Sequence, residues 1–334
     1  MTTAEHAATL DRPSDDRITE VVALAQRAPS VHNTQPWRWK FDGLRLSLMA
    51  DADRILPAAD PFGREQVISC GAVLHHARTA FAAQGWHTDI VRMPDPAHPD
   101  QLAVIDFRPW PQPPAGIAAR ASAIEHRYTD RLPMDEPREW DKLVARLQQL
   151  VSPRGLRCEA LARDIQARVA ALSGSAQAAR SDDRMYQDEL HWWAGHPDST
   201  SGVPPSGLIS DAEFARVGVA RHFPSAPHSD RRSGRIDRAR IIVLSSPGES
   251  PAQWLHSGEA LSAVLLECTV AGAATCPVTH LTEMPAARRV LAALIDDHGC
   301  PQVLVRVGAA PGAEPRPRAT PRRSVDEVLE FTHR

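Results

Sequence analysis

The sequence predicts a mixed protein of helices and strands that is built from two related halves. Residues 71–85 and 258–272 have equal length, begin and end with glycine, and carry apolar residues three and four positions apart, which is typical of a helix. Each stretch is followed by an extended apolar segment, at residues 102–107 and 302–307. The repetition therefore favours two halves with the same order of elements, and coincidence of the glycine spacing is the alternative.

A proline-rich spacer separates the two repeats. Residues 109–114 read Pro-Trp-Pro-Gln-Pro-Pro, a composition that forms a semi-rigid linker. We therefore expect residues 1–114 to form the first half and residues 115–334 the second.

Composition excludes several classes of protein. The 334 residues are 43% hydrophobic and carry a net charge of -3, so a large core is expected and a nucleic-acid partner is not. No apolar run is long enough to span a membrane and the first residues form no hydrophobic signal segment, so we expect a cytoplasmic protein. None of the five cysteines has Cys-x-x-Cys spacing, so neither a disulfide framework nor a metal site is indicated.

An amphipathic helix predicted over residues 18–27 is followed by a polar loop at residues 28–37. Pro29 and Pro36 fix φ and disfavour helix in the residue before them, so the loop should be stiff and extended. Its polar side chains would then be oriented toward the edge of a flat heterocycle such as a flavin: Ser30, Asn33 and Gln35. An Asx-type turn capped by a core tryptophan is the alternative.

This loop, Ala-Pro-Ser-Val-His-Asn-Thr-Gln-Pro-Trp, resembles the Ala-Pro-Ser-x-x-Asn-x-Gln-Pro-Trp signature of nitroreductase-like flavoproteins. Over nearly its full length the chain resembles the Acg subfamily of that group, which is associated with actinobacterial dormancy. The resemblance implies an α+β fold of two tandem halves, each an antiparallel sheet flanked by helices, that form an intramolecular pseudo-dimer. It also implies FMN as the cofactor, held in part by the loop residues Pro29, Ser30, Val31, His32, Asn33 and Gln35.

In this family an arginine-rich segment holds the FMN phosphate, and residues 124–131 fit that pattern. They offer Arg127, Thr129 and Arg131, whose guanidinium groups and hydroxyl suit a dianionic phosphate. A salt-bridged helix start with Asp130 as the partner of these arginines is the alternative.

The resemblance implies two further cofactor-binding segments. The first is a loop at residues 275–280, where backbone N–H groups of family members approach flavin N5: Pro277, Val278, Thr279 and His280. Thr279 or its neighbour is the candidate donor to N5, and we expect His280 to be a supporting or core histidine and not a metal ligand. The second is the basic stretch at residues 316–324, where Arg322 and Arg323 would complete the phosphate pocket.

A disordered basic tail is the alternative for that second segment. Ser324 followed by Glu327 has the spacing of a capping box, which favours an ordered segment.

The counterpart of this site in the other half is incomplete in the sequence. Residues 147–154 contain no equivalent of the polar loop, and residues 12–17 carry two adjacent carboxylates that would repel phosphate. We therefore expect one FMN per chain.

Residues 190–235 look like an insertion in the second half, because they are rich in Gly, Pro, Ser and His. The adjacent Trp192 and Trp193 favour a lid over the flavin, since two tryptophans are costly to leave in water. A mobile surface loop is the alternative.

Two functions are compatible with these features. In the first, NAD(P)H passes a hydride to flavin N5, and a small electron acceptor, a nitroaromatic or a quinone, then takes the electrons. No catalytic side chain is predicted for this reaction. In the second, the protein holds FMN under the lid without turnover. Because internal fusion satisfies the dimer interface, we expect a monomer.

Overall fold

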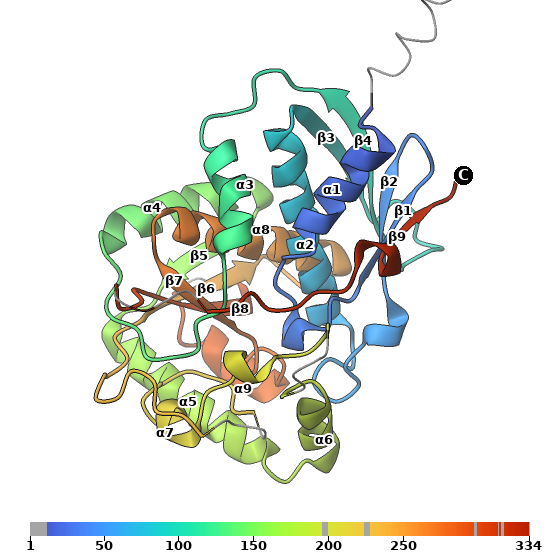
Figure 1. Ribbon diagram of the computed structural model, residues 1–334. Helices are drawn as coiled ribbons and strands as arrows, with labels where there is room; N and C mark the ends of the chain where they lie inside the picture. Colours follow the sequence, from blue (N-terminus) through green and yellow to red (C-terminus); the bar gives the residue numbers. More distant parts are fainter. Residues whose placement is uncertain are drawn as a thin grey trace, which may run out of the picture.

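The strands of the computed structural model form two sheets (Figure 1). The structure describes residues 12–195, 200–223, 228–296, 299–312, 314 and 317–333. The five-stranded sheet has the order β3-β4-β2-β1-β9, with the bounds Trp37–Phe41 (β1), Leu46–Ala50 (β2), Trp86–Arg92 (β3), Gln101–Pro109 (β4) and Leu329–Phe331 (β9). The four-stranded sheet has the order β5-β6-β8-β7, with the bounds Arg157–Ala160 (β5), Arg240–Ser246 (β6), Ala274–Val278 (β7) and Cys300–Gly308 (β8).

Two helices of 20 residues, Arg64–Ala83 (α2) and Pro251–Val270 (α8), pack against each other between the sheets (Figure 1). The other α-helices are Asp15–Ala25 (α1), Ile117–His126 (α3), Trp140–Val151 (α4), Arg163–Arg180 (α5), Arg184–Trp192 (α6), Asp211–Phe214 (α7) and Pro285–Ala292 (α9). Short 3-10 turns occupy Val31–Asn33 (η1), Ala52–Arg54 (η2), Ser152–Arg154 (η3), Pro205–Gly207 (η4) and Val325–Glu327 (η5). Within the described residues, no helix is long and apolar enough to cross a membrane.

The predicted repetition of elements is confirmed. The series β5-β6-α8-β7-β8 repeats β1-β2-α2-β3-β4, and the sheet order β7-β8-β6-β5 matches β3-β4-β2-β1. The fold is therefore of the α+β class with two tandem halves. Helices α2 and α8 each begin seven residues before the glycine that marks the repeat in the sequence, at Arg64 and Pro251.

The repeat glycines have one structural cause inside each of these helices and another just past its C-terminal end. A Cβ on Gly71 would lie 2.1 Å from the carbonyl oxygen of Leu255, and a Cβ on Gly258 would lie 1.9 Å from that of Ile68. Only glycine allows α2 and α8 to approach this closely. Just past the helix ends, Gly85 and Gly272 have φ of +82° and +73°, the left-handed conformation that commonly terminates a helix.

One strand departs from the expectation of two purely antiparallel sheets. β9 comes from the C-terminal end of the chain and pairs in parallel with β1 of the first half, with Trp39 opposite Leu329. The remaining strand pairs are antiparallel. β1 therefore lies inside the sheet, and its side chains Trp37, Trp39 and Phe41 are fully buried.

The insertion in the second half is larger than residues 190–235. In the first half, residues 42–45 join β1 to β2, whereas residues 161–239 join β5 to β6 and contain α5, α6 and α7. The expectation that Trp192 and Trp193 are both shielded from water is wrong for Trp192, which is 71% exposed at the end of α6. Trp193 packs against a buried apolar cluster that the insertion forms with residues 56–59.

Candidate cofactor site

The polar loop at residues 28–37 is not extended as expected, because residues 31–33 form the 3-10 turn η1, and its backbone is strained. His32, Asn33 and Gln35 have φ of 47°, 56° and 49°, a region that residues other than glycine rarely adopt. The Ser30 hydroxyl accepts a hydrogen bond from the Gln35 backbone N–H (3.0 Å), and the Val31 N–H donates to Ser69 Oγ of α2 (3.1 Å). Such strain is held by surrounding structure and is concentrated at functional sites.

The insertion and the C-terminal segment clamp this loop from two sides. Asn33 Nδ2 donates to the Gly202 carbonyl (2.9 Å) and to the Pro321 carbonyl (3.3 Å). Gln35 Nε2 donates to the Thr200 carbonyl (2.8 Å), and its Oε1 accepts from the backbone N–H of residue 323 (2.9 Å). These two amides therefore hold together three segments of the chain, and Asn33 Oδ1 is buried without a partner in the described part of the chain.

His32 points away from those contacts into a buried group of side chains. Its ring meets the ring of Phe223 edge to face, with centroids 5.7 Å apart, and the Arg131 guanidinium lies over the same phenyl ring at 5.6 Å. Among the residues that the structure describes, neither ring nitrogen of His32 has a hydrogen-bond partner. Burial, together with the nearby Arg221 guanidinium, lowers the pKa of His32 to about 3, so the imidazole is neutral.

The segment at residues 127–131 runs beside the start of β7. Thr129 forms a parallel bridge with Thr275, and the next residue donates its backbone N–H to the Thr275 carbonyl (2.8 Å). Because side chains alternate along extended backbone, Arg127, Thr129 and Arg131 share one face. Asp130 faces the other way and pairs with Arg232 (2.8 Å), so the alternative of Asp130 as the partner of Arg127 or Arg131 is wrong.

The loop expected at residues 275–280 is mostly an edge strand. Residues 274–278 form β7, and Pro277 is tolerated there because β7 pairs through its ladder only with β8. Thr279 follows in a turn, and its hydroxyl donates to Glu283 (2.6 Å), which also pairs with Arg221. Val278 is buried and Thr279 is half-buried.

His280 lies behind that turn as a buried supporting residue. Its Nε2 is 2.8 Å from Ser173 Oγ, and burial lowers its pKa to about 3. Across the described parts of the chain, no three His, Cys, Asp or Glu side chains are arranged to hold a metal ion.

Three arginines from distant parts of the chain converge: Arg27 after α1, Arg127 after α3, and Arg322 of the C-terminal segment. Arg322 donates to the carbonyls of residues 26–28 at 2.8–3.4 Å, and Arg127 Nη2 donates to the Arg27 carbonyl (3.3 Å). Burial and the neighbouring guanidiniums lower the pKa of Arg127 to about 10 and that of Arg322 to about 9.

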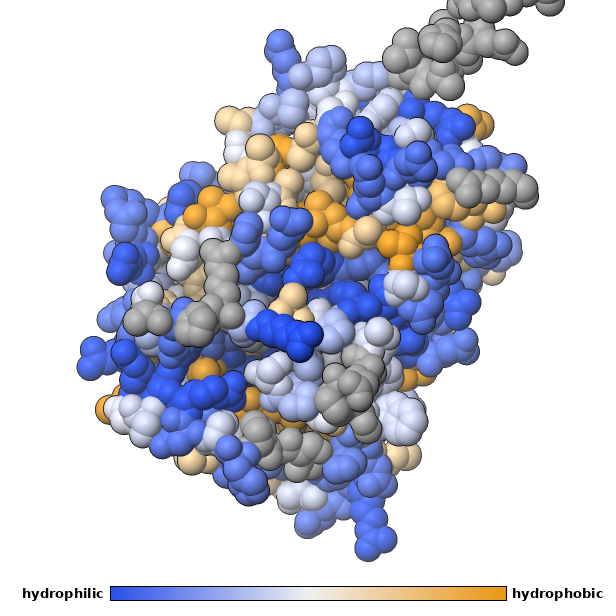
Figure 2. Space-filling view, viewed as in Figure 1, coloured by the Kyte–Doolittle hydropathy of each residue, from blue (hydrophilic) through white to orange (hydrophobic). Residues whose placement is uncertain are grey.

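This arginine cluster has unused hydrogen-bond donors. Arg27 Nε, Arg127 Nε and Arg127 Nη1 are buried without a partner, and no carboxylate of the described residues forms an ion pair with Arg27, Arg127 or Arg322. Converging cations with orphaned N–H groups are the features of a site for an anion. Hydrophilic residues gather along the middle of the face in Figure 2, where Figure 1 shows the C-terminal segment crossing.

The five residues expected to bind phosphate are thus divided. Arg127 and Arg322 belong to the arginine cluster, whereas Arg131 donates to the Gly207 carbonyl (3.0 Å) of the insertion. Thr129 lies between them on the segment. Arg323 is buried and bonds to the Gln35 carbonyl and to Asp51 (both 3.3 Å), contacts that tie the C-terminal segment to the first half.

Sequence reasoning missed Arg27. A basic residue just after a helix has a routine explanation in the helix dipole, so its type alone did not single it out. Its position directly before the polar loop was the available signal.

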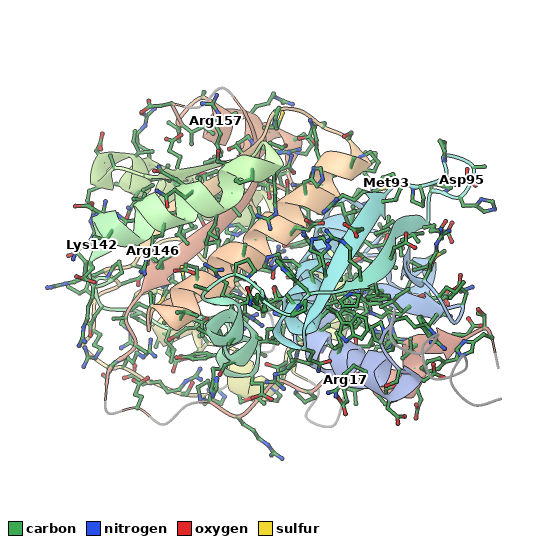
Figure 3. All side chains as sticks on the ribbon, turned by 90° about the horizontal axis from the view of Figure 1, so that it is seen from above. Arg17, Met93, Asp95, Lys142, Arg146 and Arg157 are labelled. Carbon is green, nitrogen blue, oxygen red and sulfur yellow. The ribbon has the colours of Figure 1, made fainter. Side chains whose placement is uncertain are left out.

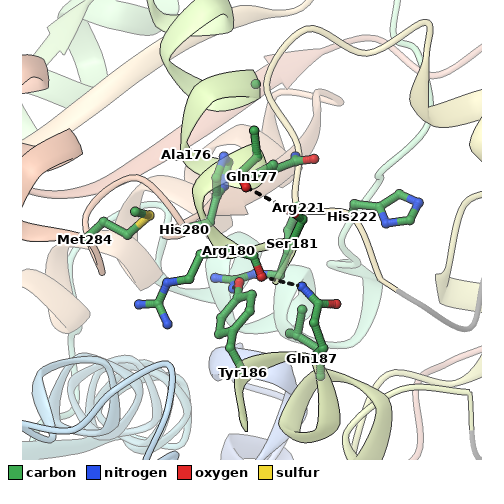
Figure 4. Close-up of a pocket in the computed structure, with 13 residues that line it drawn as sticks. Ala176, Gln177, Arg180, Ser181, Tyr186, Gln187, Arg221, His222, His280 and Met284 are labelled. Carbon is green, nitrogen blue, oxygen red and sulfur yellow. Dashed lines mark hydrogen bonds between the residues drawn. The ribbon is translucent and has the colours of Figure 1, made fainter. Parts of the chain in front are cut away.

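A cavity of about 370 Å³ opens beside this site, between α5, α6 and residues 221–222 (Figure 4). Several of its polar side chains are bonded within the protein, since Gln177 donates to the Ala220 carbonyl and Gln187 to the Arg180 carbonyl. His280 lines it, and its Nδ1 is buried without a partner. The cavity is therefore separate from the arginine cluster but adjoins the turn after β7.

Comparison with known proteins gives close relatives. No family model matches the chain. A Mycobacterium tuberculosis protein named "Putative NAD(P)H nitroreductase acg" is 46% identical over 315 residues, which cover 94% of this chain and 95% of that protein. A second M. tuberculosis protein with the same kind of name is 36% identical over 331 residues, covering 96% and 92% of the two chains.

Among solved structures, one described as a "putative nitroreductase" from Anabaena variabilis aligns with a TM-score of 0.48, 8% identity and 91% coverage of both chains. The sequence relationship to the mycobacterial proteins covers more than nine-tenths of this chain. The chain therefore belongs to the family of nitroreductase-like proteins that includes the mycobacterial protein acg.

Proposed function

We propose that this protein binds one FMN, with the phosphate on the cluster of Arg27, Arg127 and Arg322. The observation that carries the proposal is the cluster itself, which gathers three cations and three orphaned buried N–H groups without a carboxylate. A dianionic phosphate would supply both the missing charge and the missing acceptors.

The segment after Arg127 supports a direction for the rest of the cofactor. It runs along β7, and the parallel bridge between Thr129 and Thr275 brings Arg131 level with Pro277. We assign the ribityl chain of FMN to the neighbourhood of Thr129. The flavin ring would then lie near Arg131 and residues 277–280, opposite the polar loop that contains Pro29 to Gln35. The insertion contributes Phe223 and Gly207 to the same neighbourhood.

FMN, when bound, supplies hydride chemistry at its ring. The chain's own residues bind and orient it. Arg131 is held in place by its bond to the Gly207 carbonyl, and its positive charge would stabilise negative charge on a bound FMN ring. The neutral His32 and the insertion exclude water from the polar loop.

The proposed activity is the NAD(P)H-dependent reduction of a small electron-poor acceptor, a nitroaromatic or a quinone. It rests on the family relationship together with the arginine cluster. We further propose that the two repeats are the halves of a fused dimer, divided near residue 114, and that the protein is a monomer. The expected cytoplasmic location stays a prediction.

The test is to purify the protein, record its visible spectrum, and add NADPH without oxygen. We expect a yellow protein that carries one FMN per chain and bleaches. A colourless protein that takes up no FMN would contradict the cofactor, and a yellow protein that NADH and NADPH both fail to bleach would contradict the activity. Released flavin measured against protein gives the stoichiometry, and a ratio near two would contradict the single site.

A further inference from the structure

A second arginine cluster surrounds the carboxylate of Glu259, which is fully buried on α8. Arg92 binds it through two hydrogen bonds, Nε to Oε1 and Nη2 to Oε2, both 2.9 Å. Arg78 Nη1 and Arg154 Nε lie 3.3 Å and 3.6 Å from Oε2. Three guanidiniums thus meet one carboxylate, the arrangement with which proteins also bind a free oxyanion.

The internal repeat relates this cluster to the first one. Arg27 follows α1 and Arg154 follows α4, and each of these helices precedes the first strand of its half. α4 packs along α8 (Figure 3). Gly71 and Gly258 are equivalent, so the residue of α2 that corresponds to Glu259 is Ala72.

Two adjacent histidines of α2 face the two clusters. Burial and then Arg127, Arg322 and Arg27 lower the pKa of His76, whereas burial and then Arg154 and Arg78 lower that of His75. Both rings contact the same Ser262 hydroxyl at 2.7 Å, at the crossing of α2 and α8. Each histidine is therefore near the arginines of one cluster, and the two rings share the Ser262 hydroxyl. Ala72 lies one turn before His76. Because this residue is alanine where the other half has Glu259, α2 supplies no carboxylate to the first cluster.

We propose that the cluster of Arg78, Arg92 and Arg154 is a second anion-binding site, which the chain fills with its own Glu259 carboxylate. This inference rests on the proposed assignment of the first cluster as an anion site. It gives a physical reason for one cofactor per chain besides the missing loop. A phosphate cannot enter where a buried carboxylate already pairs with the three guanidiniums.

The experiment is Glu259→Ala, assayed for bound inorganic phosphate by equilibrium dialysis and for thermal stability across a phosphate series, with chloride at matched ionic strength. We expect the variant to bind one phosphate more per chain than the unmodified protein. We also expect its Tm to rise with phosphate more steeply than that of the unmodified protein and to respond little to chloride.

The increment of one phosphate is diagnostic whether or not FMN occupies the first site, so failure of the cofactor assignment and failure of this inference are distinguishable. Glu267→Ala is the matched control. Glu267 is also a buried carboxylate of α8, but only two arginines bind it, Arg120 at 3.1 Å and Arg146 at 3.7 Å, and Arg146 is half-exposed. This control should gain no phosphate.

A folded Glu259→Ala protein with no added phosphate and no phosphate-specific stabilisation would overturn the inference. If that variant folds only in phosphate, the inference is supported. Glu259→Gln, which keeps the side-chain shape, is the second variant. If both variants stay unfolded at every phosphate concentration, the inference is overturned as well, because a true anion site accepts the free ion in place of the side chain.

Discussion

Replacing Arg127 with methionine should separate cofactor binding from protein stability. The variant keeps the apolar stem but removes two buried N–H groups that have no protein acceptor. Loss of hydrogen bonds to a charged phosphate costs roughly 1.5–3 kcal/mol, so the Kd for FMN should rise about 10- to 150-fold. The apoprotein should be no less stable, because Arg127 makes one protein hydrogen bond of 3.3 Å among the described residues and lies beside two like charges.

The assay is fluorescence titration of the apoprotein with FMN and with riboflavin, and urea unfolding of the same preparations. Riboflavin has no phosphate, so its affinity should be nearly unchanged in Arg127→Met. The control is Arg323→Met, which removes bonds to Gln35 and Asp51 and should lower stability and weaken both ligands alike. Equal losses of FMN and riboflavin in Arg127→Met, or a destabilised apoprotein, would refute the assignment of this arginine to phosphate.

Three further predictions address stability and access to the site. Burial lowers the pKa of His32 to about 3. As the pH falls below 6.5, the unfolded state takes up a proton on this histidine and the folded state does not. The free energy of unfolding that is present above pH 6.5 is therefore lost progressively toward pH 3. At pH 5 the loss in the free energy of unfolding is about 2 kcal/mol. His32→Asn should remove this loss, so urea unfolding of the variant should show a smaller drop in stability from pH 7 to pH 5. Gly71→Ala should destabilise the protein by roughly 3 kcal/mol or more, because its Cβ would meet the backbone of α8, whereas Gly174→Ala in α5, with open space around it, should stabilise by about 0.5–1 kcal/mol. Gly202→Ala should loosen the insertion from the polar loop and speed flavin reduction by NAD(P)H, whereas Gly234→Ala, equally strained but without neighbours within 4 Å, should not.

Clear outcomes would contradict each of these. An unchanged difference in stability between pH 5 and pH 7 would mean that the histidine at position 32 is not kept neutral by burial. Equal effects of Gly71→Ala and Gly174→Ala would exclude a backbone contact between α2 and α8. If Gly202→Ala and Gly234→Ala leave stopped-flow reduction rates alike, residues 190–235 do not control access to the flavin.

The tandem halves were predictable because the structural requirement leaves the same glycine spacing in both halves of the sequence. Two helices that touch backbone to backbone need glycine at the contact, and the caps at Gly85 and Gly272 need positive φ, so the spacing of 14 residues appears twice in the sequence. The polar loop was predictable only in part. Its prolines end the preceding helix, but the expected extended conformation is wrong, because residues 31–33 form a 3-10 turn and His32, Asn33 and Gln35 have positive φ.

Long-range pairing was not predictable from the same patterns. Gln35 finds its partners 165 and 288 residues away, and no local feature of residues 200 or 323 indicates that meeting. Similarly, the arginine-rich spacing singled out Arg127 and Arg131, but only the packing of the C-terminal segment brings Arg127 to Arg322. The expected loop at Pro277 proved to be a strand, because at a sheet edge the missing N–H costs little.

β9 comes from the C-terminal end of the chain but completes the sheet of the first half, which constrains the order in which the molecule folds. β1 ends at Phe41 and its parallel neighbour begins at Leu329, so this sheet is completed only after nearly all of the chain has been synthesised. Loop closure over such a separation is a late and slow step. The same segment contains Arg322 and Arg323, so a phosphate-bearing ligand at the first cluster would bind only after this segment is in place. Its binding would stabilise the pairing of β9 with β1 against reopening.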